Sequence, residues 1–183
     1  RRSSDLSARV IGACMGIYHP HGDASIQEAL TNMVNSETPL VEGVGSWGDL
    51  VERAGAPRYT NCVLSKFGDT FISKDYLAVT TMVDNYDRQD KEPLNLPSLL
   101  PNLFFNGAYG IGVGMSTSLP TFTPQSGLDV MISLLNREKL EPEDYANQLK
   151  FFSMYGARPV KSKANKQAFI DYLEADQEAD HLP

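Results

Sequence analysis

The sequence contains little cysteine, little histidine and no excess of positive charge. Cys14 and Cys62 are the only cysteines among 183 residues, so they cannot form a disulfide framework, and no CxxC spacing is present to hold a metal. This usage is typical of a protein from a reducing compartment, and we expect an intracellular location. The net charge of −7 excludes a protein that coats nucleic acid with a globally basic surface, whereas a local basic or polar groove stays compatible with it.

Long apolar runs are missing as well. No stretch approaches the roughly 20 apolar residues that a membrane helix requires, so we expect no membrane contact. The first ten residues lack an initiator methionine and the apolar centre of a signal peptide, and we expect the chain to be a segment of a longer protein. With 42% hydrophobic residues, the chain can bury one core and a small appendage.

Apolar periodicity predicts two helices near the start of the chain. Helical spacing extends over residues 4–15, where Gly16 is expected to end the helix, and again over 23–35, where Asp23 is a suitable N-cap. A polar turn over 18–22 joins them, which fits a helix-turn-helix.

The rest of the chain mixes helices with short strands. Further helices are predicted to start within 62–67 and at Pro124 and Pro142, and the β-branched residues of 76–83 predict a strand. We therefore expect an α+β fold in which helices dominate, with a domain boundary near residue 136.

The His19-Pro20-His21 turn is the first candidate site. Two imidazoles flank a rigid proline at a helix N-terminus, where the exposed amides and the helix dipole favour anions such as phosphate. A metal site would need further ligands, and the only other histidine, His181, lies in the acidic tail. An ordinary surface turn is the alternative interpretation.

Arg58 and Tyr59 form the second candidate site. A tyrosine hydroxyl has a pKa near 10 and is a poor nucleophile at neutral pH unless it is assisted. A neighbouring guanidinium can stabilise the developing phenolate and hold a phosphate. The pair therefore suits covalent attack on a phosphodiester, although most Arg-Tyr pairs are ordinary surface or packing residues.

The glycine-rich run over 110–115 is the third candidate site. It is no dinucleotide-binding loop, because Pro120 and Pro124 follow too soon for a helix, and a P-loop lysine is absent. It is either a buried strand with close backbone approach or an exposed wedge whose Ile111 enters a base step and kinks DNA. Trp47 is either a stacking site or, as we expect, a core residue.

Charged side chains give weaker signals. The acidic residues form no pattern typical of a metal site. A basic cluster late in the chain is either a DNA-contacting surface or a solvated helix face, and it comprises Arg158, Lys161, Lys163 and Lys166.

Five segments in order resemble one known family. SARVIG…YHPHGD, VEGVGSWGD, PRYT, VDNYD and LPNLFFNGAYGIGVGM are similar to the A subunits of bacterial type IIA DNA topoisomerases, gyrase and topoisomerase IV. The resemblance extends over about residues 7–135 and fades beyond about 140, which suggests a divergent member, for example a viral one. It implies a winged-helix DNA-cleavage domain over 1–136 and the start of a tower-like domain over 137–183.

The resemblance also implies residue roles. Tyr59 matches the tyrosine that attacks DNA and forms a 5′-phosphotyrosyl bond, Arg58 matches the arginine that steadies the scissile phosphate, and His21 matches a residue close to that phosphate. Ile111 matches the isoleucine that wedges between bases. The implied DNA-binding residues are His19, Gly22, Ala24, Ser25, Glu28 and Ile111.

The resemblance also bears on drug binding. In drug-sensitive members a serine follows the Gly-Asp pair and an acidic residue lies four positions later. Here those positions hold Ala24 and Glu28, so half of the quinolone anchor is missing.

The implied enzyme is an ATP-dependent type IIA topoisomerase that cleaves and religates duplex DNA. Mg²⁺ and ATP are expected on a Toprim and ATPase partner, with no metal on this chain, and a homodimer is expected in the complete enzyme. We expect a cytoplasmic location in a bacterium or a virus-infected cell, and we expect the isolated fragment to be inactive in cleavage.

Two other functions stay open from the residues alone. One is a non-catalytic winged-helix DNA-binding module, and the other is an interaction domain with no DNA role. Residues 1–60 carry five basic and seven acidic side chains, so we expect DNA binding by the isolated chain to be weak and salt-sensitive.

Overall fold

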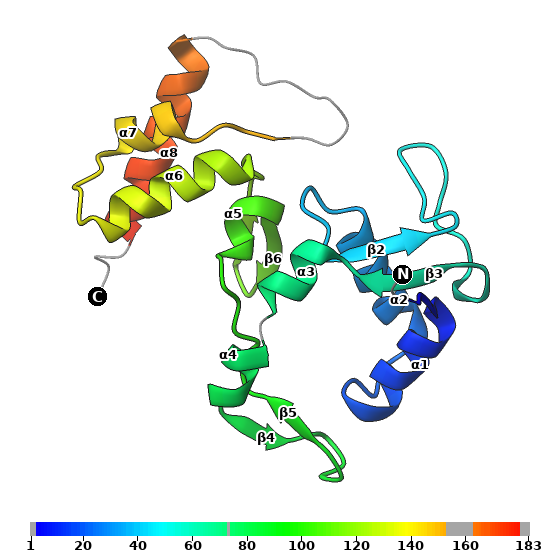
Figure 1. The fold of residues 1–183 in the computed structure, drawn as a ribbon. Helices are drawn as coiled ribbons and strands as arrows, with labels where there is room; N and C mark the ends of the chain where they lie inside the picture. The colour runs from blue at the N-terminus through cyan, green and yellow to red at the C-terminus, as the bar shows by residue number, and fades with distance from the viewer. Residues whose placement is uncertain (1–2, 73, 153–162, 180–183) are drawn as a thin grey trace. The chain divides into compact units, whose positions relative to one another are not determined.

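The computed structural model of the chain describes residues 3–72, 74–152 and 163–179 (Figure 1). The chain divides into two compact units, Arg1–Pro101 and Asn102–Pro183. Both combine helices with small antiparallel sheets, which confirms the predicted α+β class. The domain boundary expected near residue 136 stays a prediction.

The first unit holds ten elements in the described residues. They are β1 (Asp5–Leu6), α1 (Ser7–Ile17), α2 (Asp23–Val34), β2 (Val41–Val44), η1 (Pro57–Tyr59), β3 (Asn61–Leu64), α3 (Lys66–Phe71), α4 (Lys74–Val79), β4 (Met82–Asp84) and β5 (Lys91–Pro93).

The start of this unit has a winged-helix arrangement. The paired helices α1 and α2 lie beside an antiparallel sheet of order β1-β3-β2, in which Asp5 is opposite Cys62 and Val41 is opposite Leu64 (Figure 1). The predicted helix-turn-helix is therefore present, and it packs beside a three-stranded sheet.

A small core holds these elements together. Ile11 of α1, Leu30 of α2, Trp47 and Cys62 of β3 are buried against one another. Each large apolar side chain removed from water stabilises the fold by about 1.5–3 kcal/mol. Trp47 is 7% exposed, which confirms that it is a core residue, and the loop that carries it is thereby fixed to both helices.

The two cysteines are expected to react very differently with iodoacetamide. Burial raises the pKa of the Cys62 thiol, because desolvation disfavours the thiolate, whereas Cys14 is only half-buried. The thiolate is the reacting form, so at pH 8 Cys62 should react about tenfold more slowly than Cys14, and its rate should rise only at higher pH. Peptide mapping of the native chain measures both rates. Equal rates would contradict the packing of β3.

Two boundaries near the start of the chain differ from the prediction. α1 ends at Ile17 and contains Gly16, because the N–H groups of Tyr18 and His19 both close onto Cys14 O, at 2.9 Å. Residues 61–64, expected to lead into a helix, form strand β3, since β1 and β2 both pair with them.

The helix expected to start within 62–67 begins at Lys66, near the end of that range. Ser65 is its N-cap, with its hydroxyl accepting a hydrogen bond from Gly68 N at 2.8 Å. The strand predicted over 76–83 is wrong over residues 76–81. Residues 74–79 are helical, and strand pairing starts at Met82, where Pro93 of β5 first lies opposite.

The second unit contains six elements in the described residues. They are α5 (Asn102–Asn106), β6 (Ala108–Gly112), β7 (Met115–Leu119), α6 (Pro124–Leu135), α7 (Pro142–Gln148) and α8 (Lys163–Ala179).

The helix starts predicted in this unit are confirmed. Pro124 opens α6, with the Thr123 hydroxyl accepting from Ser126 N, and Pro142 opens α7 within a capping box. Phe105 and Val130 are completely buried between α5 and α6.

The late basic cluster lies only partly within the described residues. Arg158 and Lys161 fall outside them. Lys163 is exposed, whereas Lys166 forms an ion pair with Glu143 of α7 at 2.8 Å. Neither interpretation of the cluster is decided by these contacts.

The helices are short or polar compared with membrane spans. Over the described ranges, none of them is both long enough and apolar enough to cross a bilayer.

Candidate functional site

The Arg58–Tyr59 pair occupies an exposed 3-10 turn. Pro57 opens η1, Tyr59 N donates to Ala56 O at 2.9 Å, and the tyrosine is left 71% exposed. The Arg58 guanidinium carbon lies 4.8 Å from the centre of the Tyr59 ring, within cation-π range. An accessible phenol thus stands beside a fixed positive charge.

Two buried residues, Ser7 and Thr60, anchor this turn through hydrogen bonds to each other. Ser7 N and Ser7 Oγ both donate to Thr60 O at 2.9 Å, and Thr60 Oγ1 donates to Ser7 Oγ at 2.9 Å. Ser7 is 1% exposed and Thr60 is 2% exposed. The residue after Tyr59 is therefore held against the first turn of α1.

A glycine completes this support. Gly45 has φ of +100°, and a Cβ there would come 3.1 Å from Tyr59 O. Any other residue would be strained in this conformation and would crowd the η1 backbone.

The Ser7→Ala substitution is expected to destabilise the chain by about 1–3 kcal/mol, because it leaves the buried Thr60 hydroxyl without its acceptor. Thr60→Val should cost less, about 0.5–1.5 kcal/mol, since Ser7 Oγ keeps Thr60 O as an acceptor. Urea unfolding of both variants and of the double variant measures the coupling. Strictly additive losses would contradict a direct bond.

The histidine turn follows the end of α1. His21 N donates to His19 O at 2.8 Å, and the two imidazole rings stack with centroids 4.3 Å apart and planes 20° from parallel. Both histidines are exposed, so a ligand can reach either ring. Through the described ranges of the chain, no three His, Cys, Asp or Glu side chains gather in a way that would hold a metal ion.

The start of α2 carries the remaining predicted residues of the first unit. Gly22 is its N-cap, which corrects the prediction of Asp23, because Asp23 is already the first residue of the helix. Ser25 Oγ donates to Gly22 O at 2.8 Å. Ala24, Ser25 and Glu28 are exposed, whereas Leu30 is buried, so these three residues belong to the solvent-facing part of the helix. Asp23 in the first turn offsets part of the positive helix end.

Two contacts connect the helices that flank the histidine turn to the region of the tyrosine turn. Gln27 Nε2 of α2 donates to Gly55 O at 3.2 Å, just before η1, and α1 packs against η1. In the part of the chain that the structure describes, no hydrogen bond or ring contact joins His21 to Arg58 or Tyr59. His21, Arg58 and Tyr59 therefore share the first unit without touching directly.

The loop before η1 is held by a carboxylate. Asp49 Oδ1 accepts hydrogen bonds from Val51 N at 2.7 Å and Glu52 N at 2.8 Å. The bond from Glu52, followed by that from Val51, lowers the pKa of Asp49, so the carboxylate stays ionised and keeps accepting these bonds to a lower pH than an ordinary aspartate would.

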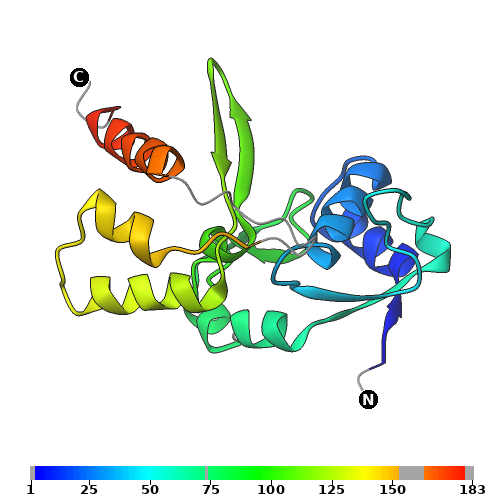
Figure 2. The same ribbon diagram turned by 90° about the horizontal axis from the view of Figure 1, so that it is seen from above.

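Ile111 lies on an exposed hairpin of the second unit. β6 pairs with β7 so that Ile111 is opposite Ser116 and Tyr109 is opposite Ser118, and Gly114, with φ of +75°, helps to close the turn. Figure 2 shows this hairpin as a two-stranded arm. Ile111 is 78% exposed, so the buried-strand interpretation is wrong, while its entry into a base step stays a prediction.

The hairpin lies in an uncharged segment of the sequence. No charged side chain occurs between Glu92 and Asp129, although the chain as a whole carries a net charge of −7. The hairpin can therefore approach phosphate groups without repulsion from carboxylates of its own segment.

Sequence reasoning missed the residues that support the site. Ser7 and Thr60 are 53 positions apart, and their bond leaves no periodic signal. Asn85 and Tyr86 lie in the VDNYD segment, which stood out only through its resemblance, and both bond to the end of α1.

Comparison with known proteins decides the family. The family model that describes the A subunit of DNA gyrase/topoisomerase IV matches residues 1–172. The chain belongs to this family. The match also corrects the expectation that the resemblance fades beyond about residue 140, because it includes α6, α7 and part of α8.

Curated relatives of this gyrase/topoisomerase IV family member agree. The chain is 38% identical to the DNA gyrase A subunit of Thermotoga maritima over 148 residues, which is 79% of the chain and 18% of that protein. It is 39% identical to the DNA topoisomerase 4 A subunit of Neisseria gonorrhoeae over 142 residues, or 75% of the chain and 18% of that protein. It is 36% identical to the DNA gyrase A subunit of Spiroplasma citri over 138 residues, which is 73% of the chain and 61% of that protein. The chain thus spans less than two thirds of each of these relatives.

Proposed function

We propose that this chain is the part of a type IIA topoisomerase that cleaves and religates duplex DNA. The observation that carries the proposal is the exposed Tyr59 phenol beside the Arg58 guanidinium, on a turn anchored to a winged-helix core. Membership of the gyrase/topoisomerase IV family supports the same function.

The proposed reaction is a transesterification. Tyr59 Oη loses its proton and forms a bond to phosphorus, the bond from phosphorus to the 3′ oxygen breaks, and that oxygen gains a proton. The DNA is left with a 5′-phosphotyrosyl end, and the reverse reaction reseals it. The phosphodiester energy is retained, so no nucleotide is hydrolysed at this step.

Each side chain has a distinct proposed role. The positive charge of Arg58 favours the phenolate and the extra negative charge on the phosphate. His21 donates a hydrogen bond to a phosphate oxygen. Ile111 enters a base step and bends the duplex. The other proposed DNA contacts are His19, Gly22, Ala24, Ser25 and Glu28.

The described residues do not fit a Mg²⁺ site of their own, because they contain no carboxylate cluster that would hold the ion. We assign Mg²⁺ and ATP to a Toprim and ATPase partner, and Mg²⁺ held there would stabilise the negative charge on the 3′ oxygen as it leaves. The complete enzyme is proposed to be a homodimer of this polypeptide together with its partner, in the cytoplasm of a bacterium or a virus-infected cell.

A covalent-trapping assay tests the proposal. The protein that carries this chain is mixed with its partner, supercoiled plasmid and Mg²⁺, and the reaction is stopped with detergent and protease. Linear DNA with protein-blocked 5′ ends is expected. DNA binding without any cleavage would contradict the proposal and indicate a non-catalytic winged-helix module.

A further inference from the structure

The β4–β5 hairpin holds the end of α1 through two side chains. Asn85 Nδ2 donates to Ile17 O at 2.6 Å, and Tyr86 Oη donates to Gly16 O at 2.7 Å. Gly16 and Ile17 are the last two residues of α1, and carbonyls at a helix C-terminus lack partners within the helix. The hairpin, about 70 residues later in the chain, therefore caps α1.

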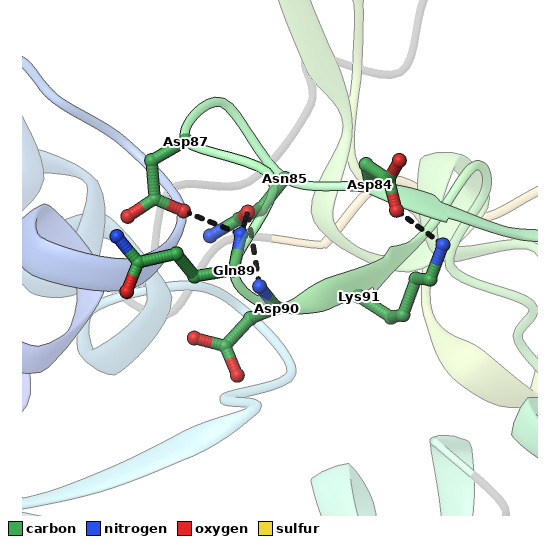
Figure 3. Close-up of polar contacts among 6 residues, drawn as sticks. All are labelled: Asp84, Asn85, Asp87, Gln89, Asp90 and Lys91. Carbon is green, nitrogen blue, oxygen red and sulfur yellow. Dashed lines mark hydrogen bonds and ion pairs between the residues drawn. The ribbon is translucent and has the colours of Figure 1, made fainter.

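Asn85 can adopt only one orientation in this contact. Its Oδ1 accepts from Gln89 N at 3.1 Å and from Asp90 N at 3.2 Å, as Figure 3 shows, and the residue is 3% exposed. Because both N–H groups point at Oδ1, the amide nitrogen must face Ile17. One buried side chain thus folds the hairpin loop and fixes it to α1.

The capped carbonyls directly precede the histidine turn. Gly16 and Gly22 flank the turn, and at both positions a Cβ would meet nothing within 4 Å, so no side chain packs against the glycines themselves. The bonds from Tyr18 N and His19 N to Cys14 O are local to α1. The hairpin bonds are long-range contacts that fix where this turn starts.

We propose that Asn85 and Tyr86 are positioning residues for His21. By holding the last two carbonyls of α1, they fix the turn that presents the His21 imidazole to a DNA phosphate. This inference rests on the proposed function, in which His21 contacts that phosphate. The two side chains themselves are assigned no contact with DNA.

Two nearly isosteric substitutions test the Asn85 and Tyr86 hydrogen bonds one at a time. Asn85→Asp keeps the acceptor oxygen but places a carboxylate oxygen against Ile17 O, whereas Tyr86→Phe removes only the hydroxyl. In the complete assembly, the cleavage rate at saturating DNA should fall about tenfold for Asn85→Asp and about threefold for Tyr86→Phe. DNA affinity should stay within about twofold. Asp84→Asn is the matched control, because Asp84 pairs with Lys91 of the same hairpin (Figure 3), and its rate should stay within about twofold.

Two further measurements distinguish positioning from general damage. In a His21→Ala background, Asn85→Asp should slow cleavage no further, because both changes remove the same contact. In the chain itself, Asn85→Asp should accelerate hydrogen exchange of the Tyr18 and His19 amides about tenfold, while the amide of Ser7 keeps its protection.

Each contrary result has a separate meaning. Fully multiplicative losses in the double variant, or an Asn85→Asp rate within about twofold of wild type, would overturn the positioning role. Unchanged exchange would overturn the capping of α1. Absence of Tyr59-dependent cleavage in the wild-type assembly would instead overturn the proposed function, and the positioning role with it.

Discussion

Tyr59→Phe is expected to abolish covalent attachment of the protein to DNA. The substitution removes only the hydroxyl, which lies on an exposed turn, and leaves the ring beneath the Arg58 guanidinium. With no oxygen to attack phosphorus, linear DNA with blocked ends should fall by a factor of at least about 10⁴. The measurement is a plasmid-cleavage time course stopped with detergent.

The control for this prediction is another exposed tyrosine. Tyr76 lies on α4 and is 41% exposed, so Tyr76→Phe makes the same chemical change outside the site. It should leave cleavage within about twofold. Both variants should bind DNA as the wild type does, and residual cleavage by Tyr59→Phe near the wild-type rate would contradict the assigned nucleophile.

Arg58→Ala is expected to slow cleavage by about 10²–10³-fold, because a preorganised charge beside the reacting oxygen stabilises the transition state more than the bound DNA. The guanidinium already lies 4.8 Å from the Tyr59 ring centre, so little reorganisation is needed. Arg58→Lys should recover only part of the rate, since an ammonium lacks the planar fork that holds a phosphate. Single-turnover cleavage at saturating DNA gives both values.

The salt dependence separates this catalytic role from simple attraction. If Arg58 contributed only one phosphate contact, Arg58→Ala would weaken DNA binding, lower the salt slope by about one unit and leave the rate at saturation unchanged. That pattern would contradict the role assigned to Arg58 in the chemical step.

The elements that local rules govern could be predicted from the sequence. The turn between α1 and α2, the helix starts at Pro124 and Pro142, and the burial of Trp47 follow from periodicity and proline geometry. Strand β3 could not be predicted, because residues 61–64 are extended through pairing with β1 and β2, which lie elsewhere in the sequence.

The candidate site also contains residues that could be predicted from the sequence and residues that could not. Tyr59, Arg58 and His21 carry recognisable chemistry, and the structure exposes all three, while their roles stay proposals. The groups that hold them in place are not visible in any local pattern. Thr60 is fixed by Ser7, which lies 53 positions away. The Ile17 carbonyl, which precedes the histidine turn, is capped by Asn85, 68 positions away.

Identification of the DNA-linked peptide tests the central claim most directly. DNA carrying a labelled 5′ phosphate at the cut site would be trapped on the wild-type protein, digested with nuclease and trypsin, and analysed by mass spectrometry. The label should lie on residues 59–66, YTNCVLSK, or on 54–66 if the nucleotide blocks cleavage after Arg58. Label at Tyr59 is the predicted result. An unmodified 59–66 peptide, with the label on another residue, would contradict the account.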